Sequence, residues 1–320
     1  MIEKEMSKRA AALIALPFRI SDRESTPIES LPDDCFGVIE KAFIYNLNET
    51  VNILTLPYSL TYQSTVNSLY SKILIAEKIR SANLMDRGMN EHDAYLVAEQ
   101  TANERIEKML NSDSLESTPL IELVILALNS LVESDHFSKI SSTYLRQAVV
   151  MVWNAFEILT RDILEQVLNH SPSLIERLSK SDVVKRRIDL KTLVWENIGT
   201  HGFNLSEAMG SIIVSSQDFS DISSIKGFFR ALLDGDQRNM KALAALDSRA
   251  LYSLSKLRHL IVHRRGMIDQ RFLAATDSKQ SVGEEVEMSV QVIENFVRAV
   301  NDCGLQLLGS ARHLLNGARA

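Results

Sequence analysis

An all-α protein is predicted by three features of this sequence. Glycine and proline are scarce, with 12 and 6 residues in a chain of 320, less than half of their usual combined share of about 12%. Helix-favouring Ala, Leu, Glu and Lys are abundant. Capping hydroxyls recur shortly before a proline that suits a first helical turn: Ser30 before Pro32, Ser117 before Pro119 and Ser171 before Pro172. Sandwiches, barrels and Gly-rich nucleotide-binding folds are therefore disfavoured.

These caps divide the chain into predicted helices. The three Ser–Pro signals begin the segments 33–54, 119–134 and 172–198, and a capping box of Asn204 with Glu207 begins the next one. Glycines mark candidate helix ends or turns: Gly88, Gly199, Gly235, Gly266 and Gly283. We expect helices near 3–16, 33–54, 59–86, 91–111, 119–134, 141–169, 172–198, 205–214, 221–234, 237–264 and 285–316.

Two domains are expected from the length and from one polar stretch. A chain of 320 residues fits about two domains of roughly 150 residues each. The segment 134–142 is polar and separates two strongly apolar helices, so we place a helical N-terminal domain at 1–138 and a second helical domain at 139–320. A loop-rich zone near 199–224 is interpreted as an insertion in the second domain. The N-terminal domain contains no pattern that indicates chemistry, and its role stays open.

The charge of the whole chain disfavours general attraction to nucleic acid. There are 35 Lys and Arg against 41 Asp and Glu, a net charge of −6. A molecule of this charge repels polyanions at long range, so any contact with RNA or DNA requires a local basic patch.

Common cofactor and metal motifs are missing from the sequence. It has no Gly-x-Gly-x-x-Gly, no phosphate-binding loop, no Gly-x-Ser-x-Gly and no His-Glu-x-x-His. Cys35 and Cys303 lie far apart and are interpreted as thiols in a reducing compartment. The longest apolar stretch, 120–132, is too short to cross a bilayer. We expect a cytoplasmic protein with no cofactor, no metal and no membrane partner.

One arginine near the end of the predicted helix 237–264 interrupts an apolar pattern. At about 100° per residue, one arc of this helix carries Leu251, Leu254, Leu257, Leu260, Ile261 and Val262. The opposite side carries Tyr252, Lys256, His259 and His263. Arg258 falls inside the apolar arc, and a buried guanidinium without a partner is costly. We therefore expect an anionic group to meet Arg258.

The same residues also permit an ordinary structural interpretation. Cations in the last turn of a helix oppose the helix dipole favourably, and His263, Arg264 and Arg265 followed by Gly266 make a good helix end. An earlier helix carries a second misplaced charge, however. Glu157 lies at the edge of an apolar stripe that contains Trp153, Phe156 and Ile163. The simplest packing pairs Glu157 with Arg258, within one protomer or across a dimer.

The combination resembles the HEPN domains. The run RHLIVH at 258–263 resembles the Arg-polar-x-x-x-His signature of that family, which lies near the end of a helix. The continuation VHRRGMID at 262–269 resembles the VHRxGxxD tail of several HEPN subgroups, and AFEILTRD at 155–162 resembles an earlier helix of such domains. The resemblance covers about 141–320 and does not include the N-terminal domain.

The resemblance implies a helical bundle that dimerises with its motif helices face to face. Many members are metal-independent ribonucleases of toxin, phage-defence or RNA-processing systems, so RNA is the implied substrate and an antitoxin or another defence-system protein a possible partner. Arg258 would engage the scissile phosphate and His263 would be the general acid or base. The 2′-hydroxyl of RNA would then be the nucleophile and a cyclic phosphate the product. His259 would orient Arg258 or contact RNA.

Local charge agrees with an RNA interface. From 247 to 271 the chain has six Arg and Lys against two Asp, a local net charge of +4, which a dimer would double. Lys256, Arg264 and Arg265 are the candidate RNA-binding residues in this stretch. A second basic run at 185–191 is better explained as a solvated helix face.

Two other interpretations remain open. The chain could be a HEPN-like interaction module that binds a partner protein or a nucleotide without cutting. It could also be a helical scaffold in which Arg258 and Glu157 form only a structural ion pair.

Overall fold

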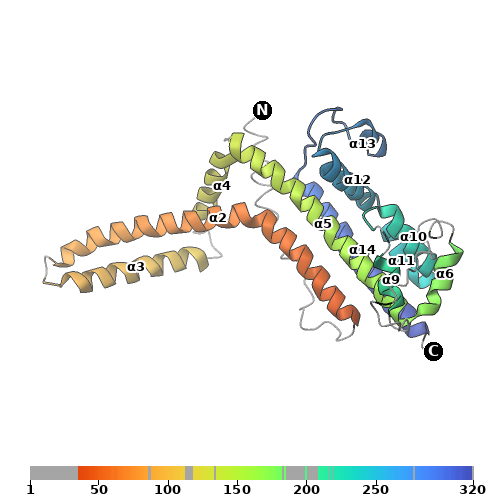
Figure 1. Cartoon of the computed structure of the whole chain (residues 1–320). Helices are drawn as coiled ribbons and strands as arrows, with labels where there is room; N and C mark the ends of the chain where they lie inside the picture. Colours follow the sequence, from red (N-terminus) through yellow and green to blue (C-terminus); the bar gives the residue numbers. More distant parts are fainter. Residues whose placement is uncertain are drawn as a thin grey trace. The chain divides into compact units, whose positions relative to one another are not determined.

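The computed structural model confirms an all-α protein. It describes residues 35–85, 88–111, 118–132, 135–181, 208–215, 219–276 and 278–318, with a few isolated positions. Within these ranges every regular element is a helix, and the one β feature is an isolated bridge between Met267 and Glu285 (Figure 1). The expected helix 3–16, the basic run 185–191 and most of 182–207 lie outside the described residues.

The chain forms two compact units. One contains Leu54–Ser141, and the other contains Ser142 onward together with the residues of the first long helix up to Ile53. The division after Ser141 is close to the sequence-based boundary at 138. The second unit thus includes the first part of this long helix, which the sequence assigns to the first domain. This part packs on helices of the second unit.

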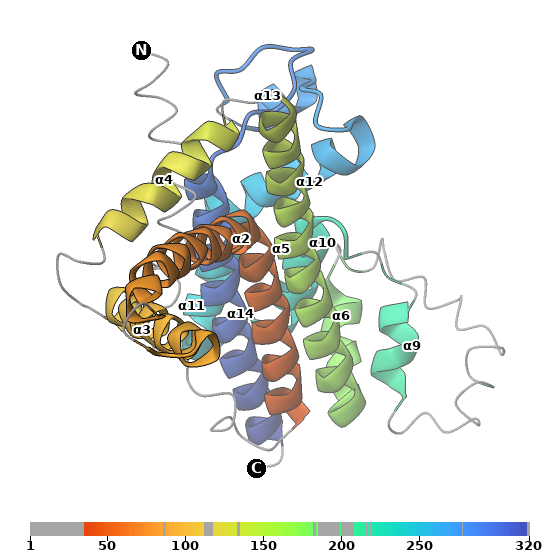
Figure 2. The ribbon, with the colours of Figure 1, turned by 90° about the vertical axis from the view of Figure 1, so that its left-hand side faces the viewer.

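In the first unit, two helices lie side by side as a hairpin (Figures 1 and 2). They are the later part of α2 (Cys35–Met85) and α3 (Glu91–Asn111). The contact face of α3 is lined by small residues at four-residue spacing, Ala94, Ala98 and Ala102, all nearly inaccessible to solvent. On α2 the buried Glu77 forms ion pairs with Arg80 at 2.6 Å and with Arg105 at 2.8 Å. The unit is completed by α4 (Thr118–Val132).

The first long helix continues where the sequence predicts a break. Separate helices at 33–54 and 59–86 are expected, but α2 is one helix of 51 residues with Pro57 inside it. A proline removes one backbone hydrogen bond and normally interrupts a helix. Here the Thr61 hydroxyl donates to the carbonyl oxygen of Pro57 at 2.7 Å. The change from one compact unit to the other falls three residues before this proline.

The core of the second unit lies where three helices meet (Figure 2). The first part of α2 lies beside α5 (Asp135–His170) and α14 (Val290–Ala318). Gly304 of α14 makes this approach possible, because a Cβ at that position would lie 2.6 Å from Phe43 and 2.7 Å from Leu159. An ion pair of 2.9 Å between Arg312 and Glu40 joins α14 to α2 as well.

Shorter helices cover this core. They are α6 (Ile175–Lys180), α9 (Met209–Ser215), α10 (Ile222–Leu233), α11 (Met240–Leu246), α12 (Arg249–Arg264) and α13 (Gln270–Ala275). The single helix expected at 237–264 is divided into α11 and α12, because Ser248 leaves the helical conformation and caps the N-terminus of α12. The sequence pattern does not predict α13.

None of the described helices combines the length and the apolar character that a membrane span requires.

Candidate functional site

Both ends of α12 are fixed by local sequence. At its start the Ser248 hydroxyl accepts a hydrogen bond from the backbone N–H of Leu251 at 3.4 Å. At its end Arg265 adopts the left-handed conformation with φ 55°, and Gly266 follows with φ 81°. The N–H of Gly266 donates to the carbonyl oxygen of Leu260 at 3.2 Å, which satisfies one of the carbonyl groups left free at the helix end. The expected stop at Gly266 is confirmed.

Arg258 lies on the apolar side of α12, as its position in the sequence predicts. Four leucines of this side are buried: Leu251, Leu254, Leu257 and Leu260. The side chain of Arg258 is partly buried among this set, and its Nε is shielded from solvent without any hydrogen-bond partner in the described part of the chain. Val262, which the sequence assigns to the same arc, is instead 47% exposed. Arg258 is therefore a cation for which the surrounding chain provides no acceptor at Nε.

The exposed side of α12 carries a row of basic side chains. The rings of His259 and His263 are one turn apart, with centroids 4.4 Å from each other and planes inclined by 45°. Lys256 precedes them by one turn and places its Nζ 5.3 Å from the ring centroid of Tyr252. Both histidines are exposed, and within the described residues neither ring forms a hydrogen bond.

The surroundings of His259 lower its pKa and make it a weaker base. Burial lowers the pKa of His259, the nearby His263, Lys256 and Arg258 lower it further, and only Asp269 opposes the shift. His259 is therefore predominantly neutral at pH 7, and can both donate and accept a hydrogen bond.

The sequence-predicted pair of Glu157 with Arg258 does not form within one chain. Glu157 accepts a hydrogen bond from the indole N–H of Trp153 at 3.1 Å and lies 3.8 Å from Arg161. Both partners are on α5 itself, at i−4 and i+4, so local helix geometry provides what a distant arginine was expected to provide. Pairing of Glu157 with Arg258 across a dimer stays a prediction.

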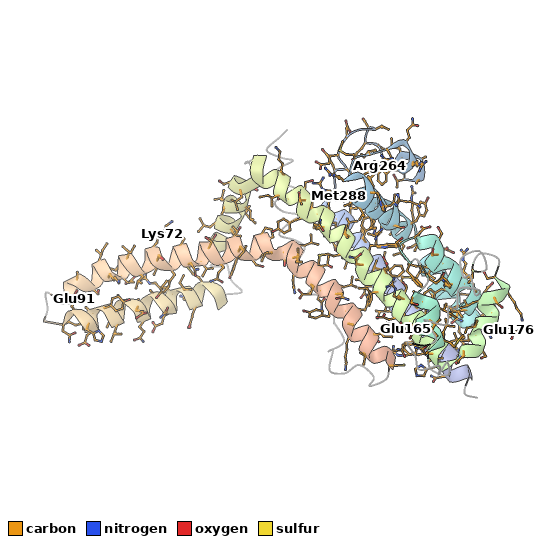
Figure 3. The ribbon with its side chains drawn as sticks, viewed as in Figure 1. Lys72, Glu91, Glu165, Glu176, Arg264 and Met288 are labelled. Atoms are coloured by element: carbon orange, nitrogen blue, oxygen red, sulfur yellow. The ribbon has the colours of Figure 1, made fainter. Side chains whose placement is uncertain are left out.

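The motif tail after α12 has a structural role. Arg264 lies at the end of α12, close to α13 (Figure 3), and its Nε is 3.7 Å from a carboxylate oxygen of Asp269. The other oxygen of Asp269 accepts the N–H of Phe272 at 2.8 Å and caps α13. Arg265 is exposed at the helix end. Gly and Asp in this tail are thus explained by turn geometry and capping.

The acidic residues within 247–271 are both engaged by cations. Asp247 lies 2.7 Å from Arg230 and 3.3 Å from Lys226 of α10. Burial opposes ionisation of Asp247, but hydrogen bonds from these two cations outweigh it, so that the pKa of Asp247 is lowered. Asp269 faces Arg264. Neither carboxylate forms an ion pair with Arg258 or with Lys256.

Two residues beside the motif are not predicted by any pattern in the sequence. Arg146 of α5 forms an ion pair with Glu285, which belongs to the segment that pairs with the end of α12. They are 139 residues apart in the chain, and no local spacing signals such a contact.

The geometry brings some predicted residues together and separates others. Lys256, His259 and His263 share the exposed side of α12, whereas Arg258 lies on its apolar side and makes no hydrogen bond with His263. In the described residues no group of three or more His, Cys, Asp or Glu is arranged to hold a metal ion.

Comparison with known proteins gives no match. No family model, no curated protein and no solved structure matches this chain.

Proposed function

We propose that this protein is a metal-independent endoribonuclease of the HEPN type, acting as a homodimer in a toxin or phage-defence system. The observation that carries the proposal is Arg258. Its Nε is buried without an acceptor in the described chain, and leaving a buried charged donor unpaired is costly. The side chain as a whole is only partly buried, so an external phosphate that reaches its guanidinium group would supply an acceptor, since guanidinium groups bind phosphate oxygens bidentately.

The proposed reaction needs only the substrate and these side chains. The 2′-oxygen of RNA attacks the adjacent phosphorus, and the bond from phosphorus to the 5′-oxygen breaks. A base removes the 2′-hydroxyl proton and an acid protonates the departing 5′-oxygen, giving a 2′,3′-cyclic phosphate and a 5′-hydroxyl. His263 performs one of these proton transfers, and Arg258 stabilises the charge on the phosphoryl oxygens.

The row on the exposed side of α12 supports RNA as the ligand. Lys256, His259 and His263 follow one another along about 10 Å of helix, from the rise of about 1.5 Å per residue, a distance that spans more than one phosphate of a single strand. Arg264 and Arg265 extend the positive charge beyond the helix end. DNA lacks the 2′-hydroxyl and is expected to bind without being cut.

A second copy is part of the proposal. Arg258 and His263 are five residues apart on one helix, hence about 140° apart around its axis. Two copies with their α12 helices facing each other would place the Arg258 of one chain beside the His263 of the other. The exposed Val262, 47% accessible, offers apolar surface for that contact.

The alternative is a non-catalytic module of the same type, which binds a partner protein or a nucleotide. One observation favours it: within the described residues His263 has no hydrogen-bonding group that would orient its ring, and catalytic imidazoles usually have such a partner. A bound phosphate on Arg258 would serve this function equally well.

Cleavage of RNA by the purified full-length protein tests the proposal. Wild type, His263→Ala and Arg258→Ala are incubated with total RNA in the presence and absence of EDTA, and the new ends are analysed. We expect EDTA-resistant cleavage with cyclic phosphate ends, reduced about 100-fold or more in both variants. His92→Ala, an exposed histidine on α3, is the matched control and should cut normally.

Two results would reject the assignment. Undiminished cleavage by Arg258→Ala or His263→Ala rules out their proposed roles. Absence of cleavage combined with tight binding of a nucleotide or protein supports the alternative. Growth of cells that express the wild type or His263→Ala tests the toxin role, since only the wild type should arrest growth.

A further inference from the structure

The turn after α12 is held by a distant segment of the chain. The N–H of Val286 donates to the carbonyl oxygen of Gly266 at 2.8 Å, and the N–H of Ile268 donates to Glu284 at 2.9 Å. Gly283 in turn donates to Ile268 at 2.9 Å. Together with the bridge between Met267 and Glu285, these bonds make a short antiparallel pairing. The last turn of α12, which carries His263, is therefore continuous with a turn that is fixed from outside the helix.

One side chain links this pairing to the core helix α5. The side chain of Arg146 is only 14% exposed and forms an ion pair with Glu285. Its Nη2 also donates to the Thr143 hydroxyl at 3.3 Å. A Cβ at Gly266 would lie 3.3 Å from Cδ of Arg146 and 3.5 Å from its Nη1. Arg146 thus packs directly against the glycine that ends α12 while it holds the opposite segment.

The contact is arranged to control position more than overall stability. Glu285 is 54% exposed, so solvent screens the ion pair and its contribution to unfolding is small. The ion pair can nevertheless hold the turn in position, because three hydrogen bonds of the pairing lie within three residues of Gly266 or Glu285. Displacement of Glu285 would release the turn, and His263 lies only three residues before Gly266.

We propose that Arg146 is a positioning residue, which acts through Glu285 and the Gly266 turn to fix the last turn of α12 and the direction of His263. This inference deepens the proposed ribonuclease function and rests on it for its activity readout. A displacement of about 1 Å in a reacting group is enough to reduce a rate by about 100-fold. Arg146 itself touches no substrate in this scheme.

A charge reversal in the full-length protein tests the proposal. Arg146→Glu and Glu285→Arg are compared with wild type and with the double variant that carries both changes. Each single variant should lower kcat for RNA by about tenfold and change KM by less than about twofold, because binding cations on α12 remain. The double variant should recover kcat to within about threefold of wild type, since the ion pair is restored with opposite polarity.

Two readouts do not depend on cleavage. Hydrogen exchange of the Val286 and Ile268 amides should accelerate about tenfold in each single variant and return in the double variant. The imidazole proton resonance of His263, assigned by its loss in His263→Ala, should shift or broaden in the single variants and recover in the double variant. Arg146→Met keeps the aliphatic part of the side chain, should melt within about 3 °C of wild type, and should still accelerate the exchange of Val286.

The outcomes separate this inference from the proposed function. If wild-type cleavage depends on His263 but neither kcat nor the His263 resonance responds to Arg146→Glu or Glu285→Arg, the positioning role is wrong and the nuclease remains. If the wild type does not cut RNA, the proposed function fails, and the exchange and resonance measurements still decide whether Arg146 positions His263. Failure of the double variant to restore these two signals overturns the inference in either case.

Discussion

Charged side chains in the middle of α5 and in the second half of α12 differ in whether the chain provides them with hydrogen-bond partners. Around Trp153 and Phe156, both fully buried with ring centroids 6.0 Å apart, the one carboxylate of that face, Glu157, receives an indole N–H and lies near Arg161. On α12 the Nε of Arg258 is shielded from solvent and has no acceptor in the described residues. The charge of Glu157 is thus satisfied within α5, whereas the Nε of Arg258 on α12 has no partner in the described residues.

Removal of an aromatic ring from α5 should have the largest effect on stability. Phe156 is completely buried, so Phe156→Ala loses both hydrophobic transfer free energy and packing, about 3–5 kcal/mol. Urea denaturation followed by circular dichroism measures the loss. Ile158→Ala on the same helix, at a position 46% exposed, is the control and should cost well under half as much. Equal losses at the two positions would show that the α5 core is not packed as described.

Replacement of Arg258 by an apolar residue tests whether its charge lacks a partner within the folded protein. Arg258→Met keeps a long side chain and removes the unpaired charge, so the free energy of unfolding should stay the same or rise. RNA cleavage should fall about 100-fold, equivalent to about 2.7 kcal/mol of transition-state stabilisation. Arg161→Met, on the exposed side of α5, is the control for removing an arginine and should cut RNA normally. A loss of more than about 2 kcal/mol of stability in Arg258→Met would instead reveal an acceptor within the folded protein.

The tight helix contact in the second unit should respond to a single methyl group. Gly304→Ala places a Cβ within 2.7 Å of Phe43 and Leu159, which requires the helices to separate and costs about 1–3 kcal/mol. Gly309→Ala on the same helix, where no atom lies within 4 Å of the added Cβ, should be stabilised by up to about 1 kcal/mol. Thermal melting of the two variants beside wild type gives the comparison. If both substitutions stabilise, α2, α5 and α14 do not meet at Gly304.

The smallest expected effect tests the exposed side of α12. Lys256→Gln removes one cation from the row, so the dependence of log affinity on log salt should become shallower by about 0.7 for single-stranded RNA. Affinity at moderate salt should fall by a few fold. Lys241→Gln, an exposed lysine on α11, serves as the control and should leave the salt dependence unchanged. Binding curves at several salt concentrations with a fluorescent RNA provide the measurement.

The sequence alone determined the fold class and several helix ends. Scarce glycine and proline predicted an all-α protein, which the structure confirms. Gly266 ends α12, and Gly88, Gly235 and Gly283 all occupy turns with positive φ, because only glycine adopts that conformation without strain. The location of Arg258 among leucines was also predictable, since the position of a residue around a helix follows from its number.

Only the tertiary structure decided what each of these groups meets. It carried α2 through Pro57 as one helix and placed Arg146 against Gly266 from a helix far away in the chain. It also showed that the Nε of Arg258 meets no acceptor in the described residues. Periodicity fixes the direction of a side chain relative to its own helix. The partner it meets depends on which distant segment packs there, and that choice is made by the free energy of the whole core.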